Sequence, residues 1–284
     1  MVNLQRRGRV ADGPREAGGT PLAPHALRVL GLLAGLTACA CSASPSGATG
    51  DTESPAAAAH REVLAALAAD VILPTYRSFH QAAGELESAA QTYAESLGGD
   101  DREALQDSWR EAIHIWQRAE VFQVGPAGSM TEALGGQDMR EEIYSWPIAN
   151  PCRVDQEIVE AAYMDVDAFA EELSNVRGLD ALEYLLFGEG EGNACRSNSA
   201  INLDGSWQAL VDAEELTQRR AAYARTVATL LVRDAKALVD VWEADATGFL
   251  AELGTAGVSS TVYPTAQEAL NAVSDAMFYL EKDT

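Results

Sequence analysis

The sequence is poor in histidine and lacks the motifs of the common metal-dependent and nucleotide-dependent enzymes. After Cys39 the 284-residue chain has only His60, His80 and His114, and no two of them have a spacing suited to binding one metal ion. There is no HExxH helix, no glycine-rich phosphate loop after a strand and no nucleophile elbow. The signatures of zinc hydrolases, P-loop enzymes and serine hydrolases are therefore absent.

Basic residues are also few. The chain has 20 lysines and arginines against 43 acids, which gives a formal net charge of −23. Residues 1–38 hold five arginines and two acids, so 15 basic and 41 acidic residues remain beyond them. Such a chain repels nucleic acid and anionic lipid and suits cations or basic partners. We expect no nucleic-acid partner, although plain solubility accounts for the charge equally well.

The chain has only four cysteines, and two of them fall far beyond the N-terminal region. Cys152 and Cys195 both lie in turn-rich stretches, Asn150-Pro-Cys-Arg and Gly192-Asn-Ala-Cys-Arg. In an exported protein such a pair forms a disulfide, and the alternative is two free thiols. The sequence predicts the disulfide.

The N-terminal region predicts export and a lipid anchor. Arginine-rich residues precede an apolar run at residues 29–38, which is far shorter than the roughly 20 residues that a transmembrane helix needs. The run ends in Leu36-Thr-Ala-Cys39, the form of a bacterial lipobox, whereas Cys41 has alanine three residues before it. We expect a signal peptide over 1–38, lipidation of Cys39, a flexible tether over 39–55 and a location in the cell envelope.

The helical pattern begins at residue 56 and continues through the folded region, 56–284. Apolar residues recur at three- and four-residue spacings, with a kink or a break expected at Pro74. No segment alternates as a strand does. The pattern predicts an all-α fold of antiparallel helices, arranged as two packed four-helix-type bundles. The main helices are expected at residues 56–97, 102–124, 178–187, 206–246 and 264–282.

Three acids occupy positions where a core helix normally has apolar residues. Asp180 and Glu183 share one face of a short helix whose apolar residues spread around its whole circumference. Glu120 continues the apolar face that runs through Trp109 and Trp116. A buried carboxylate is costly unless it is paired, hydrogen-bonded or bound to a metal.

Two interpretations of these acids are open from the sequence. The helix N-terminus or Arg177 can stabilise Asp180, and Arg118, Arg140 or another arginine can pair with Glu120. Alternatively, the three acids converge as a carboxylate site for a hard cation such as Ca²⁺, Mn²⁺ or iron.

Segments Trp109–Pro126, Ile143–Pro147 and Gly178–Gly188 occur in that order, and together they resemble the imelysin-like proteins. The resemblance spans roughly residues 60–280. It implies a bacterial envelope protein, often a lipoprotein, built from two helical bundles and tied to iron uptake. Some of the family also carry a metallopeptidase label.

The family's signature is GxHxxE, with the histidine and the glutamate as metal ligands. Here it reads Gly178-Leu-Asp180-Ala-Leu-Glu183, so aspartate replaces the histidine. The resemblance implies that Glu183, Asp180 and Glu120 are the metal ligands, with iron as the expected ion. The replacement weakens a zinc-peptidase interpretation, because zinc sites rely on histidine and cysteine. We expect ligand binding rather than catalysis, with an envelope protein partner as the non-metal alternative.

Overall fold

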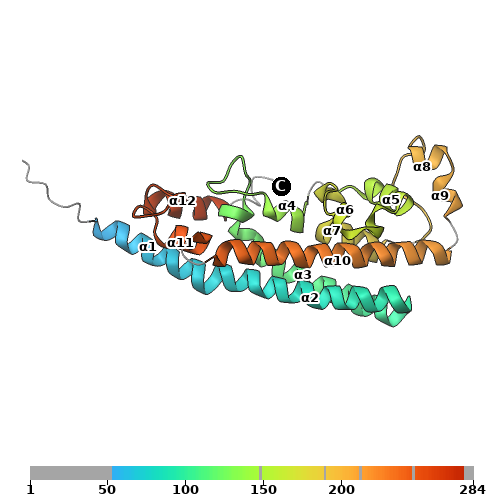
Figure 1. Ribbon diagram of the computed structural model, residues 1–284, viewed down its shortest axis with the longest axis horizontal. Helices are drawn as coiled ribbons and strands as arrows, with labels where there is room; N and C mark the ends of the chain where they lie inside the picture. The colour runs from blue at the N-terminus through green and yellow to red at the C-terminus, as the bar shows by residue number, and fades with distance from the viewer. Residues whose placement is uncertain (1–52, 147–148, 189, 211–212, 245–246, 278–284) are drawn as a thin grey trace, which may run out of the picture. The chain divides into compact units, whose positions relative to one another are not determined.

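The computed structural model describes residues 53–146, 149–188, 190–210, 213–244 and 247–277, and their regular elements are helices and helical turns (Figure 1). No strand occurs in these ranges, which confirms the predicted all-α fold. The predicted signal peptide, Cys39 and all but the end of the tether lie outside them. None of the helices described is long and apolar enough to cross a membrane.

The first helical stretch changes its geometry just before Pro74. Helix α1 covers Pro55–Leu67, a π-helical turn covers Ala68–Ile72 and helix α2 covers Leu73–Ser96. Pro74 lies in the first turn of α2, where its missing N–H group is not needed. The helix is not broken at Pro74, and the change in geometry expected there is a single π-helical turn within a continuous helical stretch.

Helix α2 ends at Leu97, which has a left-handed backbone conformation with φ of 54°. Helix α3 follows at once as Gly99–Ala119. The N-cap is Gly98, so the helix begins three residues before the predicted start at residue 102. Asp100 and Asp101 lie in the first turn of α3, where the helix dipole favours negative charge.

Four helices form the main bundle. Helix α2 packs against α3 and against α10, which covers Ala213–Glu243, while α7, Gly178–Phe187, packs against α10 and α3. Helix α1 instead packs against α11, Phe249–Gly254, and α12, Ala266–Ala276. One four-helix bundle is therefore present as predicted, and the second group has three helices in the ranges described.

Aromatic side chains connect the two groups of helices. The rings of Tyr76 and Trp242 are 5.5 Å apart, and those of Trp242 and Phe249 are 5.1 Å apart. Phe249 in turn lies 6.0 Å from Tyr263. All three pairs meet edge to face, an arrangement that stabilises a core beyond its buried area.

Short helices form the connections between the long ones. The predicted helix over 206–246 is present as α9 and α10, which are separate elements. The stretch between α3 and α7 contains α4 and α5, and α5 carries one cysteine of the disulfide. The start of this stretch has no apolar periodicity in the sequence. The short helices are α4, Met139–Ile143, α5, Pro151–Glu160, α6, Val166–Phe169, α8, Ala200–Leu203, and α9, Ser206–Ala209.

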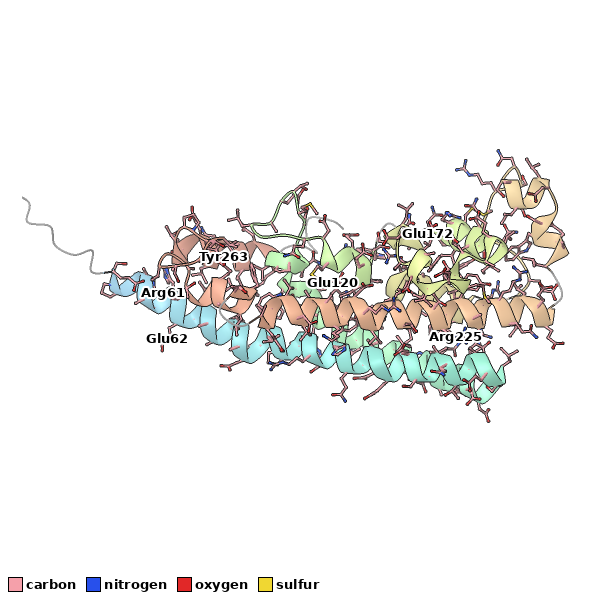
Figure 2. All side chains as sticks on the ribbon, in the orientation of Figure 1. Arg61, Glu62, Glu120, Glu172, Arg225 and Tyr263 are labelled. Carbon is pink, nitrogen blue, oxygen red and sulfur yellow. A yellow bond between two sulfur atoms is a disulfide. The ribbon has the colours of Figure 1, made fainter. Side chains whose placement is uncertain are left out.

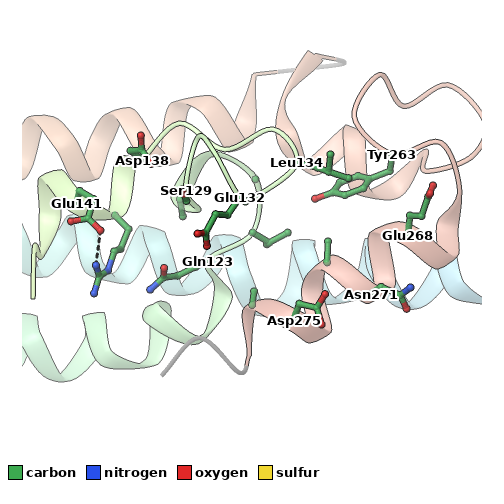
Figure 3. Close-up of a pocket in the computed structure, with 17 residues that line it drawn as sticks. Gln123, Ser129, Glu132, Leu134, Asp138, Glu141, Tyr263, Glu268, Asn271 and Asp275 are labelled. Atoms are coloured by element: carbon green, nitrogen blue, oxygen red, sulfur yellow. Dashed lines mark hydrogen bonds and ion pairs between the residues drawn. The ribbon is translucent and has the colours of Figure 1, made fainter. Parts of the chain in front are cut away.

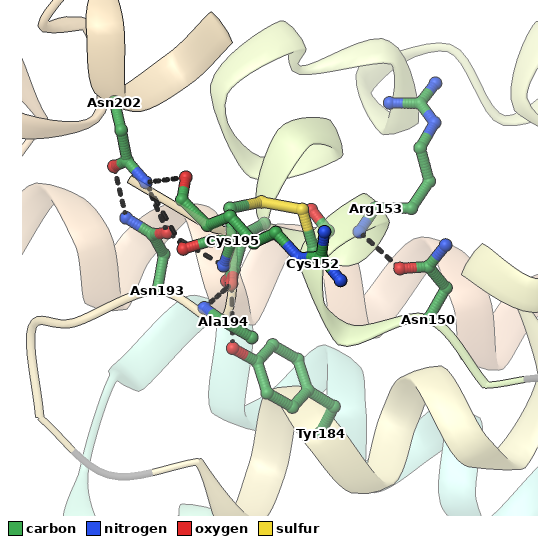
Figure 4. Close-up of a disulfide and its surroundings, with 10 residues drawn as sticks. Asn150, Cys152, Arg153, Tyr184, Asn193, Ala194, Cys195 and Asn202 are labelled. Atoms are coloured by element: carbon green, nitrogen blue, oxygen red, sulfur yellow. Dashed lines mark hydrogen bonds between the residues drawn. A yellow bond between two sulfur atoms is a disulfide. The ribbon is translucent and has the colours of Figure 1, made fainter. Parts of the chain in front are cut away.

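Cys152 and Cys195 form the predicted disulfide, which joins the first turn of α5 to the loop after α7 (Figure 4). Asp155 holds the same loop, because its buried Oδ2 accepts hydrogen bonds from the Ala194 N–H at 2.6 Å and the Tyr184 hydroxyl at 2.8 Å. The loop is thus attached by a covalent bond and by a buried carboxylate.

Removing this disulfide should destabilise the domain without changing its fold. Closing a loop between residues 43 positions apart contributes about 4 kcal/mol in the chain-entropy model. We expect Cys152→Ser/Cys195→Ser to lower the free energy of unfolding by up to that amount in urea. The wild-type protein unfolded with a reductant serves as the control, and equal stability with and without reductant would contradict the prediction.

Candidate functional site

The start of α7 lies unusually close to the end of α4. Gly178 has a φ of +77°, and a Cβ atom at this position would lie 2.7 Å from the carbonyl oxygen of Ile143. No other residue fits both the conformation and the contact. The glycine of the Gly178–Glu183 motif therefore places Asp180 beside the residues that follow α4.

Asp180 is buried next to Ser145. The Ser145 hydroxyl donates a 2.7 Å hydrogen bond to Asp180 Oδ2, while Oδ1 is buried with no well-formed hydrogen bond. Burial raises the pKa of Asp180, and the Ser145 hydroxyl and nearby backbone N–H groups of Ser145, Asp180 and Ala181 oppose that rise. One oxygen of this carboxylate thus remains able to accept a further interaction.

Glu120 is buried and paired with an arginine. It follows α3 in a helical turn, and its Oε1 accepts hydrogen bonds from Arg140 Nη2 at 3.0 Å and Arg140 Nε at 3.3 Å. In the view of Figure 2, Glu120 lies near the middle of the long axis, with Arg61 of α1 toward one end and Arg225 of α10 toward the other. Burial raises the pKa of Glu120 and the Arg140 charge lowers it. The predicted burial is confirmed, and Arg140 is the partner among the arginines considered.

Glu183 is exposed, so the expectation that α7 is buried on every side is wrong at this position. Helix α7 packs on α10 and α3, and also contacts α4 and α5, yet these neighbours leave the Glu183 face open to solvent. Asp180, one turn earlier, lies on the covered part of the helix. The three-residue spacing placed both acids on one face of the helix. It could not show which positions on that face are covered by neighbouring helices and which are exposed to solvent.

Tyr144 lies within electrostatic range of all three predicted acids. Burial raises the pKa of Tyr144 to about 12, and the charges of Glu183, Glu120 and Asp180 add to that rise. The structure therefore brings the three acids near one phenol, which the sequence did not single out as a site residue. A tyrosine hydroxyl that stays protonated can donate a hydrogen bond to an oxygen of a ligand.

The donors do not form a complete metal site. Within the described ranges, no three side chains among histidine, cysteine, aspartate and glutamate are close enough to hold an ion. Arg140 occupies Glu120 and also donates to Glu141 at 2.7 Å and to the Trp146 carbonyl at 2.6 Å. Only Asp180 Oδ1 and the exposed Glu183 carboxylate are available, so an ion here would keep water or other ligands of its own.

Helix α5 carries two buried acids that the sequence analysis did not select, Asp155 and Glu157. Both are fully buried, between the apolar residues Val154 and Ile158. Burial raises the pKa of Glu157 to about 7, although Arg153 forms an ion pair with it. The signal was an acid within an apolar helical face, the same signal that identified Glu120.

The fold and this site define an all-helical protein with a partly buried acidic site between α4 and α7. Residues 72–283 match the imelysin family, and this match covers most of the chain, so the protein belongs to the imelysin family. The sequence-based recognition of the family is confirmed.

Similar proteins carry names that refer to iron. The chain is 28% identical over 201 residues to "Iron-regulated protein A" of Synechococcus elongatus, covering 70% of this chain and 46% of that protein. It thus spans about half the length of this curated relative.

Two solved structures share the fold. One is an imelysin-like protein from Psychrobacter arcticum, with a TM-score of 0.57, 18% identity and coverage of 80% of this chain and 60% of that one. The other is a putative iron-regulated protein A precursor from Parabacteroides distasonis, with a TM-score of 0.57, 14% identity and coverage of 78% and 57%.

The raised pKa of Glu157 predicts a pH dependence of stability. Below pH 4.5 both folded and unfolded states hold the proton, and between 4.5 and about 7 only the unfolded state releases it. Stability from this group therefore falls as the pH rises through that window, by up to about 3 kcal/mol. Urea unfolding should show a decline that Glu157→Gln reduces. Glu103→Gln on α3, an exposed acid outside this ion-pair network, is the control, and equal declines in both variants would contradict the assignment.

Proposed function

We propose that this chain is an exported lipoprotein of the bacterial cell envelope that serves iron uptake by binding a metal ion as cargo. The observation that carries the proposal is Asp180, a buried carboxylate whose Oδ1 has no well-formed hydrogen bond. Glu183 lies one turn away, and the charges of both acids raise the pKa of Tyr144. The iron-related names of the relatives support the physiological setting.

The chemistry of the site favours reversible binding over catalysis. Carboxylates and a phenol are hard oxygen donors, which suit iron, Mn²⁺ or Ca²⁺ better than soft ligands do. An incomplete donor set leaves coordination positions to water or to a carrier of the ion, and release then requires breaking few protein contacts. With Asp180 in place of the family's histidine, the donors of the site are all hard oxygen atoms. Zinc sites rely on histidine and cysteine, so this donor set argues against a zinc peptidase.

A second candidate is an envelope interaction protein that keeps the fold and binds no metal. The specific observation in its favour is the buried Glu120–Arg140 pair. This pair removes one of the three acids from any ion and gives it a structural role. In this case Asp180 is held by Ser145 and by the helix N-terminus alone, and the ligand is a protein.

Metal titration distinguishes these candidates. We expect one of Fe²⁺, Fe³⁺, Mn²⁺, Ca²⁺ or Zn²⁺ to raise the thermal midpoint, with about 2.7 kcal/mol of stabilisation at a hundred times Kd. Asp180→Asn or Glu183→Gln should weaken that ion's binding about tenfold, which corresponds to about 1.4 kcal/mol.

The matched control is Glu103→Gln, which removes the same charge from an exposed position on α3. If no ion stabilises the wild type, the metal proposal fails. If Glu120→Gln then lowers stability without any ion effect, the non-metal candidate gains support.

The proposed anchor at Cys39 has a direct test. Replacing the residue by serine removes the only sulfur that the lipobox offers, and acyl chains supply about 0.8 kcal/mol of membrane affinity for each buried CH₂ group. We expect wild-type protein in the membrane fraction and labelled by radioactive palmitate, and Cys39→Ser unlabelled. Cys41→Ser should behave as the wild type, and labelling that follows Cys41 instead would overturn the assignment.

A further inference from the structure

A cavity of about 700 Å³ lies between α12, the loop after α3 and the start of α4 (Figure 3). Its volume falls within the range of small-molecule sites, about 300–1,000 Å³. Part of its wall is apolar, and the loop contributes Val124, Ala133 and Leu134 while α12 contributes Ala272 and Ala276. The cavity therefore has surface for a hydrocarbon body.

The charge around this cavity is strongly negative. Among the residues that line it, Arg140 is the one cation, and it already pairs with Glu120 and Glu141. Carboxylates from three segments surround the opening, so the local field attracts cations and repels anions. The five acids in the lining are Glu132, Asp138, Glu141, Glu268 and Asp275.

Tyr263 supplies an independent sign of a missing ligand. Its side chain is fully buried, it lines the cavity, and its hydroxyl has no hydrogen-bond partner. Figure 3 shows the hydroxyl turned away from Glu268 and toward the space beside Leu134. The buried Gln123 Nε2, also in the lining, lacks a partner as well. Buried polar groups without partners are costly, and a bound ligand would relieve that cost.

We propose that this cavity binds a small organic cation, an ammonium or guanidinium group on an apolar body, with a hydrogen bond to the Tyr263 hydroxyl. The cationic group would lie near Glu132 and Asp275, which are exposed and whose carboxylates form no hydrogen bond or ion pair in the described part of the chain. The apolar body packs on the wall from α12 and the loop. Because a tyrosine hydroxyl both donates and accepts, it serves an amine or an oxygen on the ligand.

A bare metal ion does not fit the same cavity. Asp138 Oδ1 accepts the Met130 N–H at 2.7 Å, Glu141 pairs with Arg140, and Glu268 accepts from the Thr265 hydroxyl at 3.1 Å. Within the described part of the lining, no three acids are close enough to hold an ion. The cavity is also separate from the carboxylates around Tyr144, with Arg140 at the boundary, so this proposal does not depend on metal binding there.

Three probes with the same six-carbon body test the proposal on the full-length protein: hexylamine, hexanol and hexanoate. The carboxylates around the cavity attract an ammonium group, leave an alcohol unaffected and repel another carboxylate. We therefore expect hexylamine to bind about tenfold or more tightly than hexanol, and hexanoate to show no binding. Binding is measured by ligand-detected NMR and by calorimetry. Equal affinity of the amine and the alcohol, or binding of the carboxylate, would overturn the proposal.

Two variants locate the binding within the cavity. Tyr263→Phe removes only the hydroxyl, so we expect about fivefold weaker hexylamine binding with an unchanged or higher thermal midpoint. Glu132→Gln/Asp275→Asn should weaken hexylamine about tenfold and leave hexanol unaffected, whereas Glu103→Gln leaves both probes unchanged. Unchanged hexylamine affinity in both cavity variants would refute the site. Asp180→Asn should not alter hexylamine affinity, which separates this result from the metal test.

Discussion

The contact between the start of α7 and the end of α4 determines most of the arrangement around the acids. Gly178 lets the two backbones approach to a distance that any Cβ atom would prevent. This contact places Asp180 against Ser145, next to Tyr144, whose pKa the three carboxylates raise. The Trp109 indole N–H donates to the Leu179 carbonyl at 2.8 Å, so α3 holds the same end of α7 from the other side. The arrangement of the site thus depends first on the close approach of the α4 and α7 backbones, which positions the side chains.

Aspartate in place of histidine at position 180 is consistent with this setting. A carboxylate can use the N–H groups at a helix N-terminus and the hydroxyl of Ser145, all of which are donors. A neutral imidazole at the same place would have to present a lone pair to one donor and find an acceptor for its own N–H. The surroundings of position 180 therefore suit an anion, which keeps the site negative and hard.

The sequence predicted the elements better than it predicted their surroundings. Helix α7 begins and ends at the predicted residues, because Gly178 and Gly188 bound an apolar run. The burial of Glu120 followed from its spacing with Trp109 and Trp116. The identity of its ion-pair partner could not be predicted from that spacing. Several arginines were available, and Arg140 lies in a stretch with no helical periodicity. The exposure of Glu183 and the central place of Tyr144 depend on tertiary contacts that helical spacing does not encode.

The shortage of basic residues explains why the acidic sites remain open to ligands. Several arginines serve more than one acid: Arg140 pairs with Glu120 and Glu141, and Arg153 with Glu157, Glu160 and Glu172. Sharing does not reach every buried carboxylate, because Asp180 has hydrogen-bond donors rather than an arginine beside it. Glu183, and Glu132 and Asp275 of the cavity beside α12, are exposed acids that form no ion pair in the described part of the chain. These acids favour positively charged ligands at both places.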